Sequence, residues 1–96
     1  MVVFLTNKFL ELIPNNDDTL IIEKAVELVD DCHLVVDGKT IEFDYLIAYD
    51  QSFIEKHHLP FVMDGKNIIT NWVGQSSIEN IYIGNFQKAI EDLFEN

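Results

Sequence analysis

The residues best suited to chemistry stand in two short runs, Asp30-Asp31-Cys32-His33 and His57-His58. Carboxylate oxygen, thiolate sulfur and imidazole nitrogen are the usual protein ligands of zinc and related metals. Adjacent side chains point to opposite faces of a strand, or about 100° apart around a helix, so neither run by itself directs two ligands at one ion. The ligand spacings of zinc motifs are also missing. We therefore expect solvated chain at both runs, with no metal and no cofactor.

Nucleophilic catalysis needs a nucleophile, a base and an orienting group that converge in space. Ser76 and Ser77 follow Gly74, but the segment Gly-Gln-Ser-Ser-Ile lacks the second glycine of a nucleophile elbow. Cys32 stands among acidic residues, which raise the pKa of a thiol and so reduce the amount of thiolate. No catalytic residue is therefore assigned, and enzyme activity has no motif in its support.

Charge is the strongest compositional signal: 17 acidic residues and six basic residues give a net charge of −11, and all six basic residues are lysines. Without arginine there is no planar fork for bidentate binding of phosphate, and a negative field repels the nucleic-acid backbone. Direct nucleic-acid binding is disfavoured, and a basic protein surface is the expected partner. The alternative is that the acidic charge only keeps an apolar-rich chain in solution.

The apolar residues, 48% of the chain, come in stretches of a few residues. A membrane-spanning helix needs about 20 consecutive apolar residues, so no membrane partner is expected. The first residues lack a basic leader before their apolar positions, which predicts a cytoplasmic protein. A single cysteine, Cys32, rules out an intrachain disulfide.

Two segments with helical periodicity are expected to form the two main helices of the fold. Across residues 19–30 the apolar positions recur at helical spacing, with charged residues on the other side. A second stripe predicts a helix after Gly84-Asn85; its members are Phe86, Ala89, Ile90, Leu93 and Phe94. A shorter helix is expected to begin at a capping box over residues 52–55 and to end before Pro60.

Two Asp-Gly dipeptides, Asp37-Gly38 and Asp64-Gly65, each stand between β-rich runs. Asp-Gly is the strongest short-range hairpin signal, because a type I′ turn needs positive φ at both central residues. Clean alternation predicts one strand over residues 40–49, after the first dipeptide. The other expected elements are strands at residues 2–6, 33–36, 61–63, 67–70 and 79–83, and a strand or helical turn at residues 9–13.

Hairpins imply antiparallel pairing of neighbouring strands. We therefore expect an α+β fold, with a mostly antiparallel sheet built from hairpins and two main helices packed on one face. The length of 96 residues suits a single domain over residues 1–96.

The run VDGKTIEFDYLIA at residues 36–48 combines a hairpin turn with a β-rich strand, and the run NIYIGN at residues 80–85 is a second strand followed by a turn. The first resembles the strand pair of flavin-dependent pyridine-nucleotide reductases that ends in Ala-Thr-Gly, and the second is similar to that family's later strand ending in Gly-Asp near the flavin. Here Tyr49-Asp50 stands in place of Thr-Gly, and Asn85 replaces the acid. The chain also has no G-x-G-x-x-G fingerprint, so we carry over neither the flavin nor the activity.

These observations favour a small acidic protein-binding module, of the inhibitor, immunity-protein or nucleic-acid-mimic type, that docks on a basic protein surface. Complementary charge speeds encounter, and exposed aromatic side chains supply anchors. The candidate partner-binding residues are Asp30, Asp31, Glu42, Asp44, Trp72 and Tyr82.

A second hypothesis, of another class, is a small enzyme or ligand-binding subunit with its site in the loop over residues 71–77. That stretch gathers the polar or aromatic residues Asn71, Trp72, Gln75, Ser76 and Ser77, and functional residues often lie on loops. Seven Phe, three Tyr and one Trp are also many for so small a core. We therefore expect a homodimer, or an aromatic patch reserved for another protein.

Overall fold

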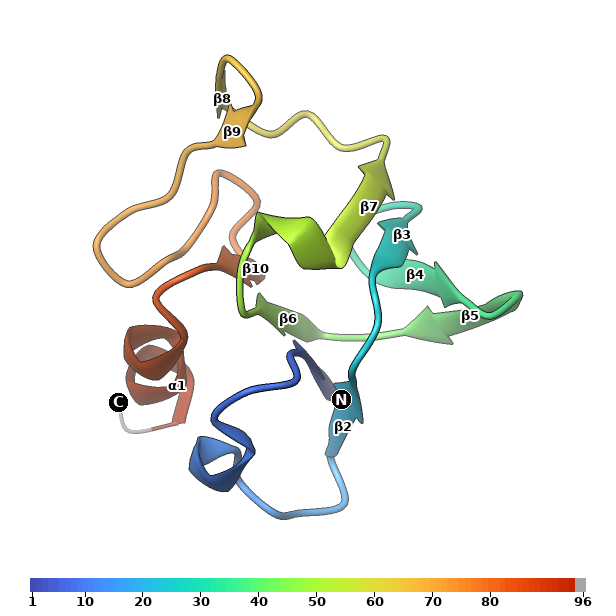
Figure 1. Cartoon of the computed structure of the whole chain (residues 1–96), viewed down its shortest axis with the longest axis vertical. Coiled ribbons are helices and arrows are strands. Elements are labelled where there is room, and N and C mark those ends of the chain that lie inside the picture. Colours follow the sequence, from blue (N-terminus) through green and yellow to red (C-terminus); the bar gives the residue numbers. More distant parts are fainter. Residues whose placement is uncertain (95–96) are drawn as a thin grey trace.

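The computed structural model of the chain describes residues 1–94, which form three sheets and one α-helix (Figure 1). Sheet A has the strand order β10-β6-β1-β2, sheet B has the order β5-β4-β3-β7, and sheet C is the pair β8-β9. The strands are β1 (Val2–Leu5), β2 (Thr19–Ile22), β3 (Val26–Leu28), β4 (His33–Val36), β5 (Lys39–Glu42), β6 (Tyr45–Ala48), β7 (Ile54–His57), β8 (Met63–Asp64), β9 (Asn67–Ile68) and β10 (Ile81–Ile83). The helical elements are the 3₁₀ turns η1 (Leu10–Leu12) and η2 (Gln51–Phe53) and the helix α1 (Phe86–Phe94).

All four strands of sheet A run parallel to one another. Val2 of β1 stands opposite Thr19 of β2 on one side and Tyr45 of β6 on the other. Strand β1 is buried along its whole length. A parallel sheet that is covered on both faces needs consecutive apolar residues in its strands, and the run Val-Val-Phe-Leu meets this need.

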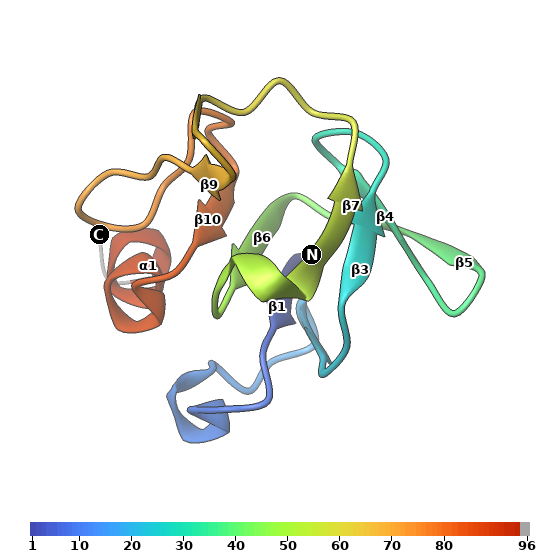
Figure 2. The same ribbon diagram turned by 45° about the horizontal axis from the view of Figure 1, so that its top comes forward.

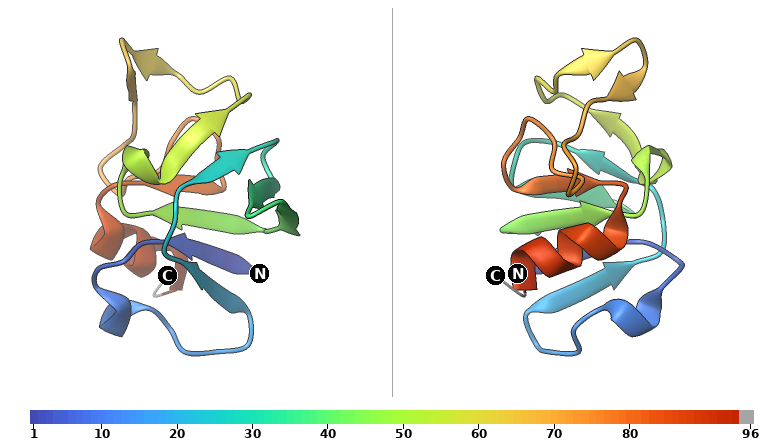
Figure 3. Two further views of the ribbon diagram at one scale, coloured as in Figure 1. Left: turned by 45° about the vertical axis from the view of Figure 1, so that its right-hand side comes forward. Right: turned by 90° about the vertical axis from the view of Figure 1, so that its left-hand side faces the viewer.

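Sheet A lies between α1 on one face and sheet B on the other (Figures 2 and 3). Along β1, Val2 and Phe4 pack with the helix, while Val3 and Leu5 pack with sheet B. The buried stripe of α1, formed by Phe86, Ala89 and Ile90, follows the helical period expected from the sequence. The C-terminal helix is therefore confirmed. None of the helices among residues 1–94 is long and apolar enough to cross a membrane.

The expected fold class is wrong. The described chain contains one helix in place of two main helices, and its strands divide among three sheets with both parallel and antiparallel pairs. Sheet A is parallel throughout, and β7 pairs in parallel with β3 in sheet B. Local hairpin signals describe neighbouring strands only, so they carried no information about the parallel pairs, which join strands distant in the sequence.

The helix expected over residues 19–30 is also absent from the described chain: this stretch forms β2 and β3, with a bend between them. In β3, Val26 and Leu28 are buried while Glu27 between them is half-buried, which is the period of a strand. Two short strands separated by a bend can imitate helical spacing. Pairing of β2 with β1 and of β3 with β4 makes the stretch strand rather than helix.

Both expected hairpins are present, but their details differ. Asp37 and Gly38 have φ of 52° and 75°, as a type I′ turn requires, and connect β4 to β5. In the second hairpin Asp64 pairs with Asn67, so Gly65, with φ of 61°, and Lys66 occupy the turn itself. This turn lies one residue later than the Asp-Gly dipeptide predicted.

The single strand expected over residues 40–49 is two strands in different sheets, β5 and β6, separated by Phe43 and Asp44. The short helix expected to begin at residues 52–55 and to end before Pro60 is only the turn η2, after which β7 begins at Ile54. The strands at residues 2–6 and 79–83 are confirmed as β1 and β10, and residues 9–13 contain the helical turn η1.

Candidate functional site

The amino ends of the parallel strands lie along one edge of sheet A, and acidic residues come with them. Asp18 directly precedes β2, Asp44 directly precedes β6, and Glu79 stands two residues before β10. Asp31, from the turn between β3 and β4, lies at the same edge. Together these four residues surround a cavity of about 760 Å³, which we call the amino-end pocket.

Asn80 ties two parts of this edge together. Its side-chain Nδ2 donates hydrogen bonds to the backbone oxygens of Asp31 (2.6 Å) and Asp44 (3.0 Å). These bonds connect the start of β10 with the turn before β4 and with the start of β6. They bring Asp31, in the turn before β4, and Asp44, just before β6, to the same cavity.

The lining of the amino-end pocket combines negative charge with apolar surface. Its charged side chains are all carboxylates, while Tyr45, Ile78 and Leu93 contribute apolar area. The amino group of Met1 lies at the same edge, hydrogen-bonded to Asp44 and 3.3 Å from Asp18. The hydrogen bond to Asp44 raises the pKa of this amino group. Chemically, such a pocket suits an ammonium or guanidinium group carried on an aliphatic stem.

The six candidate partner-binding residues are distributed unequally around the amino-end pocket. Asp31 and Asp44 line it, and Asp30 and Glu42 flank the nearby side chain of His33. Trp72 does not line the pocket, although it is 77% exposed, as expected of an anchor. Two other pocket residues, Asp18 and Glu79, were not among the predicted ones. An acid just before a β-rich run was the signal that could have found them.

Tyr82 is only 3% exposed, so the expectation that it lies on the surface is wrong. Its hydroxyl donates a hydrogen bond to a carboxylate oxygen of Asp92, 2.7 Å away. Burial raises the pKa of Tyr82, and the contact with Asp92 raises it further. Tyr82 therefore acts within the structure as a link between β10 and α1.

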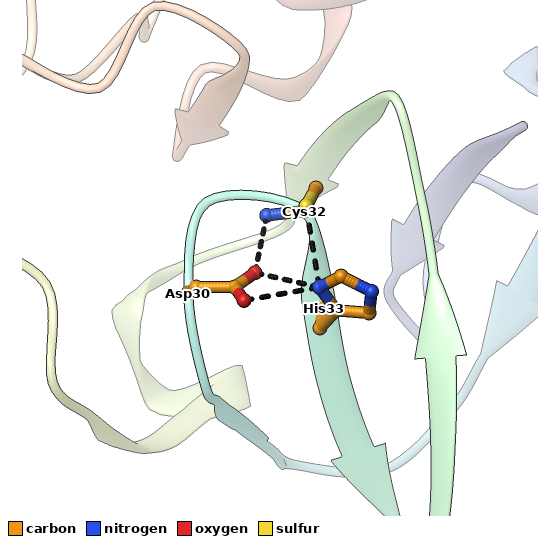
Figure 4. Close-up of side chains that lie close together, drawn as sticks. All are labelled: Asp30, Cys32 and His33. Carbon is orange, nitrogen blue, oxygen red and sulfur yellow. Dashed lines mark hydrogen bonds and ion pairs between the residues drawn. The ribbon is translucent and has the colours of Figure 1, made fainter.

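Asp30, Cys32 and His33 form a compact cluster in the turn before β4 and at its start (Figure 4). His33 Nδ1 lies 2.9 and 3.0 Å from the two carboxylate oxygens of Asp30 and 3.2 Å from Cys32 Sγ. The backbone N–H of Cys32 and the His33 ring lower the pKa of Asp30 to about 2. The pKa of Cys32 is raised to about 11; desolvation is the largest cause, and a hydrogen bond to Asp30 is the next largest.

This cluster is unsuited to nucleophilic catalysis. In a catalytic relay the nucleophile and the orienting acid contact different nitrogens of the imidazole. Here Cys32 and Asp30 both face Nδ1. A thiol whose pKa is about 11 also supplies little thiolate at neutral pH.

A second cavity, of about 450 Å³, lies at the opposite edge of sheet A, beyond the carboxyl ends of its strands. We call it the carboxyl-end pocket; Phe9, Tyr49, Phe86 and Asn85 help to line it. The ring centroids of Phe9 and Tyr49 are 5.9 Å apart. Phe9 has φ of 56° and Asn85 has φ of 42°, in the left-handed region that bulky residues rarely adopt.

The loop over residues 71–77 uses its polar side chains to hold its own shape. Asn71 Oδ1 accepts hydrogen bonds from the backbone N–H groups of Val73 (3.0 Å) and Gln75 (2.9 Å). Ser76 Oγ donates to the backbone oxygen of Ile78, and Ser77 Oγ accepts from the N–H of Val62. These polar side chains bond backbone groups, so their hydrogen bonds do not support a ligand site in the loop. Such a site remains a prediction.

Comparison with known proteins adds no relative. The chain matches no protein-family model, no curated protein and no solved structure.

Proposed function

We propose that the chain is a protein-binding module that docks on a basic protein surface and receives a lysine or arginine side chain in the amino-end pocket. The observation that carries this proposal is the convergence of four carboxylates from four separate segments on one cavity: Asp18, Asp31, Asp44 and Glu79. A net charge of −11 supports the same conclusion, because it accelerates encounter with a positive partner.

The mixed lining favours a basic side chain over a free metal cation. Lysine and arginine bury an aliphatic stem against apolar surface while the charged head remains among polar groups. Tyr45, Ile78 and Leu93 supply that apolar surface beside the carboxylates. Binding at this pocket would therefore combine burial of the stem with charge-assisted hydrogen bonds to the head.

The position of the pocket favours a macromolecular partner. In open α/β sheets small ligands bind outside the carboxyl ends of the strands, and the amino-end pocket lies at the other end. A nucleic-acid mimic would need carboxylates in an extended row, whereas here they surround one cavity. The arrangement therefore supports an inhibitor-like or immunity-protein-like docking surface more than mimicry.

The test compares two double variants of equal net charge. Asp31→Asn with Glu79→Gln removes two pocket carboxylates, and Glu11→Gln with Glu55→Gln removes two exposed carboxylates elsewhere. Affinity for a fluorescent oligoarginine peptide is measured at low and at moderate salt. We expect the pocket variant to bind about tenfold more weakly than the wild type, since each partly exposed ion pair contributes up to about 1 kcal/mol.

The control variant should bind within about twofold of the wild type at moderate salt, where long-range charge is screened. Equal losses in both variants would mean that only net charge matters, which would overturn the pocket proposal. No measurable peptide binding by the wild type at either salt concentration would overturn the docking function itself. Circular dichroism checks that both variants are folded.

A small-ligand site is the second candidate function, and the carboxyl-end pocket favours it. The chain leaves β1 toward β2 on one side and later returns to β6 on the other, so the order of sheet A reverses between β1 and β6. Ligands of open α/β sheets bind at such reversal points. The strained backbone of Phe9 lies beside it, and strain of this kind is common at functional sites.

The aromatic lining suits a small planar ligand without negative charge. Indole and benzamidine are suitable probes, and the backbone amide resonances of Tyr49 and Asn85 report on the pocket. Shifts at these amides that saturate with either probe would support the site. Unchanged amides with both probes would remove this candidate.

A further inference from the structure

The turn between β3 and β4 brings together three different metal-ligating side chains within four residues of sequence. Asp30 Oδ1 accepts a hydrogen bond from the backbone N–H of Cys32 at 2.9 Å, which closes the turn. Asp30 and Cys32 precede β4, so the alternation of a strand does not separate their side chains. As a result, a carboxylate oxygen of Asp30, Cys32 Sγ and one ring nitrogen of His33 all lie within 4.8 Å of one another (Figure 4).

We propose that Asp30, Cys32 and His33 form a binding site for a divalent transition metal of the Zn²⁺ or Co²⁺ type. One sulfur, one nitrogen and one oxygen ligand make up a borderline-soft set, which favours these ions over Mg²⁺ and Ca²⁺. Both Asp30 and Cys32 face the same His33 nitrogen, Nδ1, at 2.9 and 3.2 Å. A cation between the three atoms would contact all of them at once.

A second observation concerns the other nitrogen of the His33 ring. Imidazoles that bind metals usually donate their remaining N–H to a carboxylate, which orients the ring. His33 stands directly opposite Glu42 in the β4–β5 pair. His33 Nε2 lies 3.7 Å from Glu42 Oε2, so a small rotation of this exposed carboxylate completes the bond. The strand register therefore supplies the orienting carboxylate as well as a ligand.

The electrostatic surroundings also suit a divalent cation. Asp31 is next to Asp30 and Cys32 in the sequence, and Glu42 lies beside His33, so both add negative charge near the three ligands. A bound divalent ion is attracted by such a field and stabilises a coordinated thiolate. The thiol proton passes to solvent when the sulfur binds the metal. The Asp30 and His33 side chains are 50% and 35% exposed, which leaves an entry path and an open coordination position.

The test is titration of the full chain with Co²⁺, followed by competition with Zn²⁺. A cobalt–thiolate bond gives a near-ultraviolet charge-transfer band, and Cys32 is the single cysteine of the sequence. We expect this band in the wild type and its loss in Cys32→Ser. Asp30→Asn and His33→Gln should each weaken Co²⁺ binding by at least about tenfold, and Glu42→Gln by about tenfold or less. The control is His58→Gln, which removes the contact of 3.3 Å between His58 and Glu27 and should leave the band unchanged.

A measurement on the wild type keeps the proposal falsifiable if a variant fails to fold. Zn²⁺ should shift the ring resonances of His33 and leave those of His57 and His58 in place. Absence of a charge-transfer band at millimolar Co²⁺ would overturn the proposal. Unchanged affinity for Co²⁺ in both Asp30→Asn and His33→Gln would also overturn it. The same holds if Zn²⁺ shifts only the ring resonances of His57 and His58.

Discussion

The two edges of sheet A carry different kinds of surface, although the same four parallel strands begin at one edge and end at the other. At the amino edge, acidic residues precede the strands and surround the amino-end pocket. At the carboxyl edge, Phe9, Tyr49 and Phe86 line the carboxyl-end pocket. Phe9 and Asn85, which are not glycines, adopt the left-handed backbone conformation there. One edge is thus built around charge, and the other around aromatic contact and strained turns.

This difference shows that one small sheet can present two kinds of surface at its two edges. Long-range attraction of a basic partner depends on charge and weakens with salt. Binding of a small planar ligand depends on shape and apolar contact, and salt affects it little. The two edges can therefore be changed independently, provided that the shared sheet remains folded.

The largest expected effect concerns that shared sheet. Leu46 is fully buried in β6, at the centre of the molecule, while Ile21 on the edge strand β2 is 41% exposed. Leu46→Ala should lower the free energy of unfolding by about 2–5 kcal/mol, because it leaves a cavity in the core between sheets A and B. Ile21→Ala should cost about 1 kcal/mol or less. Urea denaturation measures both, and equal costs would show that the two edges do not depend on a common core.

The difference in charge between the two edges should change the pKa of a thiol placed at each edge. Desolvation, Asp30, Asp31 and Glu42 hold the pKa of Cys32 near 11 in the folded chain, against an ordinary value of 9.0. The pKa of Cys32 is measured from the ultraviolet absorbance of the thiolate, with a chelator present. We expect the raised pKa in the folded chain and the ordinary pKa in urea. Because the folded pKa is the higher one, the folded state loses stability as pH rises above the unfolded value.

The matched comparison moves the thiol to the other edge. In a Cys32→Ser background, Gln87→Cys places a thiol in the first turn of α1, where the helix N-terminus stabilises a thiolate. This thiol should titrate at a lower pH than Cys32. Equal titration of the two thiols would contradict the electrostatic difference between the edges.

The third prediction tests the strain at Phe9. A residue with a Cβ atom costs about 1–2 kcal/mol in the left-handed region, and glycine avoids this cost. Phe9→Gly and Phe9→Ala both remove the ring, so the difference between them isolates the backbone. We expect Phe9→Gly to be about 1 kcal/mol more stable than Phe9→Ala in thermal or urea unfolding. Ala25→Gly, where φ is not positive, should show the ordinary loss on introducing glycine.

The smallest effect is the pH dependence that Asp30 contributes near the amino edge. Its pKa is lowered from 3.8 to about 2, so its charged form is favoured by folding. The resulting stability is present above pH 3.8 and is lost as pH falls through about 2. The difference in stability between the wild type and Asp30→Asn should therefore shrink between pH 4 and pH 2. A difference that is constant across this interval would contradict the lowered pKa.

Part of the fold could be predicted because it depends on short-range chemistry. The turn at Asp37-Gly38, with both residues at positive φ, follows from the residue types alone. The buried stripe of α1 follows from its helical period. The parallel sheet was missed, although its strands carry a sign of it: the uninterrupted apolar run of β1 is typical of a strand buried on both faces.

The candidate site could be predicted only in part for a similar reason. Asp31 and Asp44 were identified as acidic residues, but their neighbours Asp18 and Glu79 come from distant segments. Strand or helix geometry through residues 30–33 would keep Asp30, Cys32 and His33 from facing one ion. A turn takes the place of both before β4, and it brings the three side chains together.

The sequence by itself determined the charge, the turn at Asp37-Gly38, the first strand and the last helix, because each depends on composition or on residues a few positions apart. Only the tertiary structure decided that β1 pairs with both β2 and β6, and that the acids before these strands meet. Asn80 and Asp31, which join at the amino-end pocket, are 49 positions apart. Contacts over such separations depend on which buried faces pack together and on which parallel pairing satisfies the backbone hydrogen bonds. Periodicity and turn signals, which act over a few residues, carry no information about that choice.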